Sequence, residues 1–288
     1  MTVQVSYKNK ISSNNIVLFV DYIFNTKPIE KYLTKIELNY INGLIKQKDL
    51  KKNFHLFEIN SKKKIILISL KKNLEAFEIE NLGADFYNFI KTNNISKLSI
   101  NSHTIKNEFQ DNPTGRFLHG LKLKAYEFNF YKYKKNKNLI LIDVFTKKNN
   151  NTIKNEIRFK ALEEGTNFAR DLVSEPPNVL NPKEYVKRLL KLRKLGIKVT
   201  VYNEKQLFKL GMHSLLGVGR GSINESFLVT LEWNGNKKNK KELLSFVGKG
   251  VCFDTGGISL KPAKFMEEMK YDMAGSAVVA GLIQSLAI

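Results

Sequence analysis

The sequence predicts an α/β protein in which helices cover a mostly parallel sheet. Short runs rich in Ile, Leu and Val alternate with longer segments of helical periodicity, which is typical of an α/β layer domain. The chain has 288 residues, of which 42% are hydrophobic and 26% are charged. This is enough apolar material for one large domain or two of ordinary size, and it excludes intrinsic disorder and fibrous structure.

In the first half of the chain, apolar runs predict buried strands, because a strand covered on both faces has little need of polar residues. These strands are Ile16 to Val20, Lys64 to Leu70, Lys97 to Ile100 and Leu139 to Val144. From Leu74 to Thr92, large apolar side chains recur every three or four residues, which predicts an amphipathic helix. The polar stretch Lys147 to Thr152 lacks periodicity and is the predicted linker. We therefore expect one domain over residues 1–150 and a second over residues 151–288.

In the second half, a long helix is predicted from Ile153 to Ser174, where two prolines follow and stop it. Another helix begins after Asn181, an N-cap followed by proline, and runs to about Leu195. The remaining predicted elements are a strand at Ile197 to Tyr202, a short helix at Glu204 to Leu210, and strands at Phe227 to Trp233 and Glu242 to Phe253. This order predicts a mostly parallel, helix-covered sheet with Trp233 in the core.

The chain is strongly basic, with 48 basic and 27 acidic side chains and a net charge of +21. Such a balance ordinarily indicates a nucleic-acid or anionic-membrane partner. Only six of the basic residues are Arg, and Lys, Asn and Ile all have A/T-rich codons, so a biased genome explains the excess. We favour a solvated, solubilising surface. The densest patches, Lys62 to Lys64 and Lys132 to Lys137, leave weak, salt-sensitive nucleic-acid binding as an alternative.

Three features favour a cytoplasmic protein without a membrane partner. No apolar run approaches the roughly 20 residues that a membrane-spanning helix needs. Residues 1–15 lack the basic, apolar and small-residue parts of a secretory signal. The single cysteine, Cys252, cannot form an internal disulfide, which fits a reducing compartment.

The stretch that carries chemistry is V-G-K-G-V-C-F-D-T-G-G-I-S-L-K-P over residues 247–262, followed by M-E-E-M-K-Y-D-M-A-G over residues 266–275. Asp254 lies just before a Gly-Gly turn, and Lys249 lies five residues earlier. Residues five apart point to opposite faces of a regular strand, so the strand must bend if both are to serve one site. The glycines on either side of Lys249 allow such a bend. Asp272 opens a downstream helix that carries a face of small residues.

Two interpretations of these residues are about equally supported by their chemistry alone. The carboxylates and lysines are either helix caps and surface ion pairs, or part of a site for divalent cations. Carboxylates are hard oxygen donors that suit Mg, Mn or Zn. A lysine can bind a cation only as the neutral amine, and burial and the cation's charge both favour loss of its proton.

The segment 247–275 resembles the signature of the M17 leucyl aminopeptidases, also called cytosol aminopeptidases. N-F-A-R-D-L-V-S-E-P-P-N over residues 167–178 and G-M-H-S-L-L-G-V-G-R-G-S over residues 211–222 are also similar to family segments. The resemblance is close over about residues 155–288, whereas residues 1–150 match only in pattern. It implies a macro-like N-terminal α/β domain followed by an incomplete α/β metallo-exopeptidase catalytic domain.

The resemblance also implies roles for individual residues. Lys249 and Asp272 would ligate one metal ion, and Asp254 would bridge it to a second. Lys261 would be the catalytic residue that stays protonated and polarises the scissile carbonyl or stabilises the oxyanion. Two divalent ions, Mn or Zn, would bind the free amino terminus of a peptide substrate and activate a water for attack on the first peptide bond. The expected reaction is leucine-type aminopeptidase hydrolysis by a homo-hexamer. Some family members also bind DNA, so a non-catalytic or DNA-binding remnant is the alternative.

The sequence departs from the family pattern at its end. The family supplies three more functional residues in a later N-T-D-A-E-G-R segment, namely an Asp, a bridging Glu and an Arg that binds bicarbonate. No such segment occurs before Ile288. We therefore expect an incomplete catalytic domain that is inactive by itself. An incomplete gene sequence, a truncated gene product and a deliberate short form are the open explanations, and we favour the first two.

Overall fold

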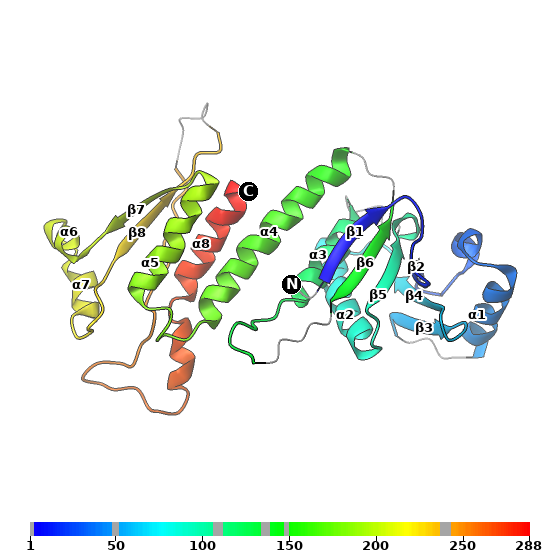
Figure 1. Cartoon of the computed structure of the whole chain (residues 1–288), viewed down its shortest axis with the longest axis horizontal. Helices are drawn as coiled ribbons and strands as arrows, with labels where there is room; N and C mark the ends of the chain where they lie inside the picture. Colours follow the sequence, from blue (N-terminus) through cyan, green and yellow to red (C-terminus); the bar gives the residue numbers. More distant parts are fainter. Residues whose placement is uncertain (1–2, 48–51, 106–111, 134–138, 147–149, 237–242) are drawn as a thin grey trace. The chain divides into compact units, whose positions relative to one another are not determined.

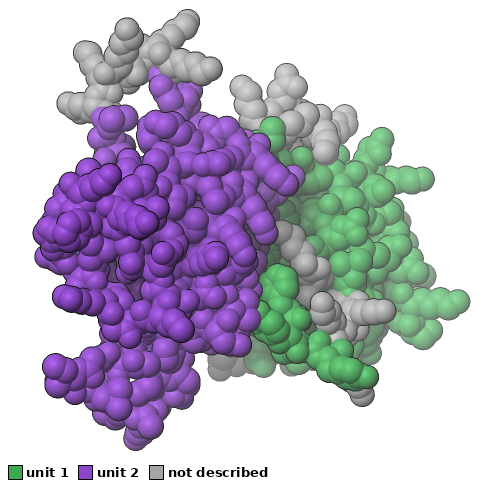
Figure 2. Space-filling view, turned by 60° about the vertical axis from the view of Figure 1, so that its left-hand side comes forward, with its two compact units in different colours: residues 1–159 green, residues 160–288 purple. Residues whose placement is uncertain are grey.

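The computed structural model describes residues 3–47, 52–105, 112–133, 139–146, 150–236 and 243–288. The chain divides into two compact units, Met1–Phe159 and Lys160–Ile288, which are described separately (Figure 2). This division falls within helix α4, Asn150–Ser174. Of the predicted linker, residues 147–149 lie outside the described residues, and residues 150–152 belong to α4. None of the described helices is both long enough and apolar enough to cross a lipid bilayer.

Unit 1 is a six-stranded sheet in the order β1-β6-β5-β2-β4-β3, with helices on both faces (Figure 1). All neighbouring strands are parallel except β3, which pairs antiparallel with β4. The elements in chain order are β1 (Val3–Lys8), β2 (Asn15–Asp21), η1 (Lys27–Tyr32), α1 (Lys35–Gln47), β3 (Phe54–Glu58), β4 (Lys64–Leu70), α2 (Ala76–Thr92), β5 (Lys97–Asn101), η2 (Ser102–Thr104), α3 (Pro113–Lys124) and β6 (Ile140–Phe145). The four strands and the helix predicted in this half are confirmed.

The apolar runs of the central strands fill two cores, one on each face of the sheet. Successive side chains of a strand point to opposite faces. Val17 and Phe19 of β2 therefore pack with α2 and α3, whereas Ile16 and Leu18 pack on the side of α1. Because β2 and β4 must supply both cores, nearly every residue in their interiors is apolar.

Unit 2 is built around three helices, α4, α5 and α8, and a two-stranded sheet (Figure 1). After α4, its elements are α5 (Pro182–Leu190), η3 (Lys191–Leu195), β7 (Lys198–Tyr202), α6 (Glu204–Lys209), α7 (His213–Gly219), β8 (Leu228–Glu232), η4 (Met266–Tyr271) and α8 (Ala274–Ala287). Small residues allow α8 to approach α4 closely, since a Cβ added at Gly281 would lie 2.4 Å from the Gly165 carbonyl oxygen. The predicted small-residue face of this helix is confirmed, with Ala277 and Ala280 buried.

Two predictions about strands in the second half are wrong. The sheet is antiparallel, because β7 pairs antiparallel with β8 after a connection that holds two short helices rather than one long crossover helix. The other wrong prediction is a strand at Glu242 to Phe253; residue 242 lies outside the described residues, and Leu243 to Phe253 forms no strand. A strand needs a neighbour for its backbone groups, and no described strand pairs with this segment. Leu243 and Val247 are accordingly 96% and 98% exposed.

Trp233 does not lie in the core, contrary to the prediction. It follows the last residue of β8 and is 40% exposed. Its ring lies against Gly235, where an added Cβ would approach the ring to 2.1 Å. The indole is therefore covered by its own loop, which the apolar run of the preceding strand does not reveal.

Candidate functional site

The candidate site begins with a tight turn over residues 254–261. The backbone N–H of Lys261 donates to the carbonyl of Thr255 at 2.9 Å, and Gly256 and Leu260 form an isolated antiparallel bridge. Gly256 has φ +85°, a conformation that residues with a side chain rarely adopt. The turn folds the chain back on itself, so Lys261 returns to the side of Asp254.

Asp254 and Lys261 form an ion pair across this turn, with Lys261 Nζ 3.1 Å from Asp254 Oδ2. The other carboxylate oxygen, Oδ1, accepts the backbone N–H of Gly256 at 2.8 Å. The Gly256 hydrogen bond, followed by the hydrogen bond and charge of Lys261, holds the pKa of Asp254 below its ordinary value. The charge of Lys249 lowers this pKa further, so Lys249 lies within electrostatic reach of Asp254.

Lys249 and Asp272 form a second ion pair, with Nζ 3.1 Å from Oδ2. The pair links the segment from Leu243 to Phe253, called the extended segment below, to Asp272, which lies just before α8. Asp272 Oδ2 is buried, yet none of the described residues donates a well-formed hydrogen bond to it, because the Lys249 contact meets the distance but not the angles of such a bond. This carboxylate oxygen therefore keeps acceptor capacity for another partner.

The close approach of two backbones brings Lys249 to Asp272. The N–H of Ser276, in the first turn of α8, donates to the Lys249 carbonyl at 2.9 Å. A Cβ added at Gly248 would lie 2.5 Å from the Ser276 Cα, so only glycine fits at this crossing. We predicted that the glycines beside Lys249 permit a bend; at Gly248 the structure shows a closer requirement, which is contact with the helix backbone.

The structure places the four residues singled out from the sequence in two ion pairs, Lys249 with Asp272 and Lys261 with Asp254, and the charge of Lys249 acts on Asp254. Two carboxylates and an amine are a chemically suitable donor set for a divalent cation, and the unsatisfied Oδ2 of Asp272 is consistent with one. The Lys249 side chain is 61% exposed, so the described residues do not supply the burial that would favour its neutral amine. The charge of a bound cation is the remaining physical reason for that form.

Histidine and cysteine residues do not add to this site. No group of three or more His, Cys, Asp and Glu side chains with the geometry of a metal site occurs in the described part of the chain. Cys252 is buried, and burial raises the pKa of its thiol to about 11, so it is not a thiolate at neutral pH.

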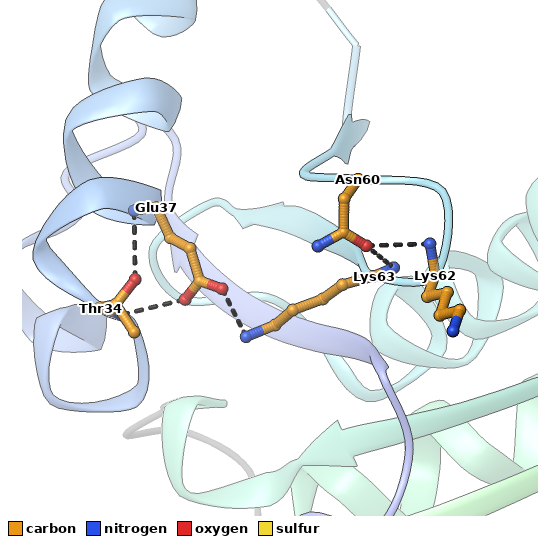
Figure 3. Close-up of polar contacts among 5 residues, drawn as sticks. All are labelled: Thr34, Glu37, Asn60, Lys62 and Lys63. Atoms are coloured by element: carbon orange, nitrogen blue, oxygen red, sulfur yellow. Dashed lines mark hydrogen bonds and ion pairs between the residues drawn. The ribbon is translucent and has the colours of Figure 1, made fainter.

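The first basic patch is partly neutralised by carboxylates. Lys63 pairs with Glu37 of α1 (Figure 3), and Lys64 Nζ lies 2.7 Å from Glu58 Oε1. The Oδ1 of Asn60 accepts the backbone N–H groups of Lys62 and Lys63, which fixes the turn that carries them. These pairs reduce the positive charge available to a phosphate. In the second patch, residues 134–137 lie outside the described residues.

Residues 167–288 match the family model of the catalytic domain of the cytosol aminopeptidase family. The match contains all four site residues, and it begins within α4.

Curated relatives named probable cytosol aminopeptidase extend the match upstream. The chain is 48% identical over 172 residues to the protein of Afipia carboxidovorans, an alignment that covers 58% of this chain and 34% of the relative. With the protein of Phytoplasma australiense the identity is 42% over 201 residues, covering 69% of this chain and 41% of the relative. The chain therefore spans well under half the length of these curated relatives.

Solved structures of the same fold cover both units. A tomato leucine aminopeptidase mutant matches with a TM-score of 0.76 and 19% identity, over 99% of this chain and 59% of that one. The bottromycin maturation enzyme BotP in complex with Mn matches with a TM-score of 0.72 and 20% identity, over 96% of this chain and 56% of that one. At these identities the likeness establishes the α/β fold.

Two residues near the candidate site, Ser276 and Tyr185, were not predicted from the sequence. Both lie within the matched residues 167–288. Ser276 stands between Gly275 and Ala277 at the start of α8, and this hydroxyl among small residues was an available signal. Tyr185 had no local signal, since its contact with Ser276 joins residues 91 positions apart.

Proposed function

We propose that this chain forms part of a metal-dependent aminopeptidase that removes N-terminal, leucine-type residues from peptides. The observation that carries the proposal is the pairing of Lys249 with Asp272 and of Lys261 with Asp254, each at 3.1 Å, within the family-matched segment. The buried Oδ2 of Asp272 contacts Lys249 and accepts no hydrogen bond from the described residues, which supports a further partner such as a cation. The Mn complex of BotP supports metal dependence.

In this proposal, Lys249, Asp272 and Asp254 would hold divalent cations, Mn or Zn. Such cations supply Lewis-acid chemistry, which holds a free amino terminus and lowers the pKa of a bound water. The Lys261 ammonium, which pairs with Asp254, would donate to the carbonyl oxygen of the scissile bond as negative charge develops there. Capture of the neutral α-amine restricts the reaction to the first peptide bond.

We further propose that the 288 residues alone do not hydrolyse peptides. Three donor side chains are fewer than two cations need, because such ions take about four to six ligands each. Additional carboxylates, and any bicarbonate site, would have to be supplied from outside these residues. Assembly into a hexamer belongs to the same proposal for the whole protein.

The test joins these 288 residues to the remaining part of the Phytoplasma australiense relative and measures hydrolysis of leucine-p-nitroanilide with added Mn²⁺. We expect the fusion to be active and the 288-residue chain to be inactive. In the fusion, Asp272→Asn should lower kcat/KM by at least roughly 100-fold, since it removes a ligand rather than an outer contact. Glu267→Gln, the same change at an exposed carboxylate of η4, is the control and should leave the rate unchanged.

Two results would contradict the proposal. Hydrolysis by the 288-residue chain alone would show that three donors suffice. An active fusion that keeps its rate after Asp272→Asn would remove Asp272 from the metal site.

A further inference from the structure

A pair of hydroxyl groups joins α5 to α8 beneath the candidate site. Tyr185 of α5 is 6% exposed and lies in the apolar core of unit 2. Its hydroxyl is 3.0 Å from the Oγ of Ser276, in the first turn of α8. A buried phenol needs a polar partner, and Ser276 is the partner that the fold provides.

The direction of these hydrogen bonds follows from the number of protons. The Ser276 hydroxyl has one proton and donates it to the carbonyl of Met273 at 2.8 Å. Tyr185 must then donate to Ser276 Oγ. Burial raises the pKa of Tyr185 to about 12, so the phenol keeps the proton that this bond requires. The result is a chain of two bonds, from Tyr185 through Ser276 to the Met273 carbonyl.

Ser276 contacts Lys249 and Met273, the residue next to Asp272. Its backbone N–H donates to the Lys249 carbonyl at 2.9 Å, which fixes the extended segment. Its hydroxyl holds the carbonyl of Met273, the residue directly after Asp272. The close fit of Gly248 against the Ser276 Cα leaves little room for either backbone to shift.

We propose that Ser276 and Tyr185 are positioning residues that hold Lys249 and Asp272 in register as a pair of metal ligands. The proposal rests on the proposed function for the metal, but the positioning itself can be measured without one. Ligand side chains bind a cation well only when their backbones are fixed, and outer groups that fix them affect affinity strongly. Neither residue would touch the metal or the substrate.

The experiment uses the 288-residue chain with Ser276→Ala, Tyr185→Phe and the double substitution. Two matched controls remove hydroxyls elsewhere in unit 2. Ser285→Ala lies on the same helix and removes bonds of 3.0 Å to the Ala161 and Gly281 carbonyls, and Tyr202→Phe lies on β7. The first readout is hydrogen exchange of the amide at position 276, which donates to Lys249. The second is titration with Mn²⁺, followed by paramagnetic broadening of the amide signals of Gly275 and position 276.

We expect faster exchange at position 276 in both single variants and an apparent Mn²⁺ affinity lower by roughly tenfold. Because the two hydroxyls form one chain, the double variant should lose no more affinity than Ser276→Ala alone. Ser285→Ala should lower stability while it leaves the Mn²⁺ affinity unchanged, which separates positioning from a merely structural role.

Unchanged exchange at position 276 in both single variants would overturn the positioning role, as would equal Mn²⁺ affinities in all variants. If the losses of Mn²⁺ affinity in the two single variants added up in the double variant, Tyr185 and Ser276 would not act through one chain of hydrogen bonds. If the unsubstituted chain showed no Mn²⁺ broadening, the metal assignment would fail, and the exchange measurement would still decide whether Tyr185 and Ser276 hold Lys249 in place.

Discussion

At the scale of single residues, Asp254 of the candidate site and Glu37 of unit 1 show how carboxylates are paired in different surroundings. Asp254 is partly exposed and relies on a backbone N–H and on Lys261. Glu37, in unit 1, is buried, and its carboxylate is held by Lys63 and by Thr34 at the start of α1 (Figure 3). Thr34 and Glu37 exchange side-chain to backbone bonds, which is the arrangement of a capping box.

This arrangement predicts a pH-dependent contribution of Glu37 to stability. Burial raises the pKa of Glu37, but the hydrogen bonds from Lys63 and Thr34 outweigh it and lower the pKa below 4.5. A lowered pKa means that the stabilisation is present above the unfolded value and is lost as the pH falls through the folded one. Glu37→Gln should therefore lower the free energy of unfolding of unit 1 by about 1 kcal/mol at pH 7.

Urea unfolding at pH 7 and at a pH near 3 checks this prediction. The difference between the unsubstituted chain and Glu37→Gln should shrink at the lower pH, because protonation removes the charge from Glu37 itself. Glu58→Gln is the control, since Glu58 is exposed and its pair with Lys64 should contribute less than about 1 kcal/mol. A difference for Glu37→Gln that is the same at both pH values would disprove the interpretation.

At the scale of elements, close packing depends on glycines at helix crossings. In unit 1, a Cβ added at Gly83 of α2 would lie 1.9 Å from the Phe117 carbonyl oxygen of α3, and one at Gly120 would lie 1.8 Å from that of Glu80. In unit 2, Gly165 of α4 and Gly281 of α8 meet in the same way. Such contacts place helix backbones closer together than alanine would allow.

We predict that Gly281→Ala destabilises unit 2 by roughly 1–3 kcal/mol, because the new methyl group meets the backbone of α4 rather than a side chain that can move. Gly217→Ala, in α7, is the matched control. It meets no atom within 4 Å and should be neutral or slightly stabilising, since alanine favours the helix. Thermal unfolding of the two variants measures the contrast. Equal melting temperatures would show that α4 and α8 separate without cost.

At the scale of the whole molecule, the apolar residues form separate cores. Two clusters lie on the faces of the unit 1 sheet, and a third, which includes Leu172, Tyr185 and Met273, lies in unit 2. Each unit therefore buries apolar surface of its own, which is the main source of its stability.

Separate cores predict that the two units respond independently to substitution. Trp233 is the single tryptophan and reports on unit 2 by its fluorescence. Gly281→Ala should shift the transition seen by Trp233 and leave the hydrogen exchange of β2 and β4 unchanged. Glu37→Gln should make the hydrogen exchange of β2 and β4 faster and leave the transition seen by Trp233 unchanged. One shared transition that both variants move equally would instead indicate a single cooperative unit.

The sequence by itself determined the central strands β2, β4, β5 and β6 and the helices with clear periodicity or caps, and it predicts the four residues of the candidate site. These features depend on runs and spacings within about 20 residues, where local periodicity is the dominant signal. The strands β1 and β3 and the helices α1 and α3 were missed, because the strands are only six and five residues long and the helices interleave their apolar residues with polar and charged ones.

Only the tertiary structure decided which residues are partners. It paired Lys249 with Asp272 and Lys261 with Asp254, made β7 and β8 antiparallel, and left Leu243 to Phe253 without a neighbouring strand. It also joined Tyr185 to Ser276. The physical reason is that the direction of a strand, the burial of an apolar run and the partner of a hydroxyl depend on which distant segment packs against them, and one segment's own sequence does not encode that choice.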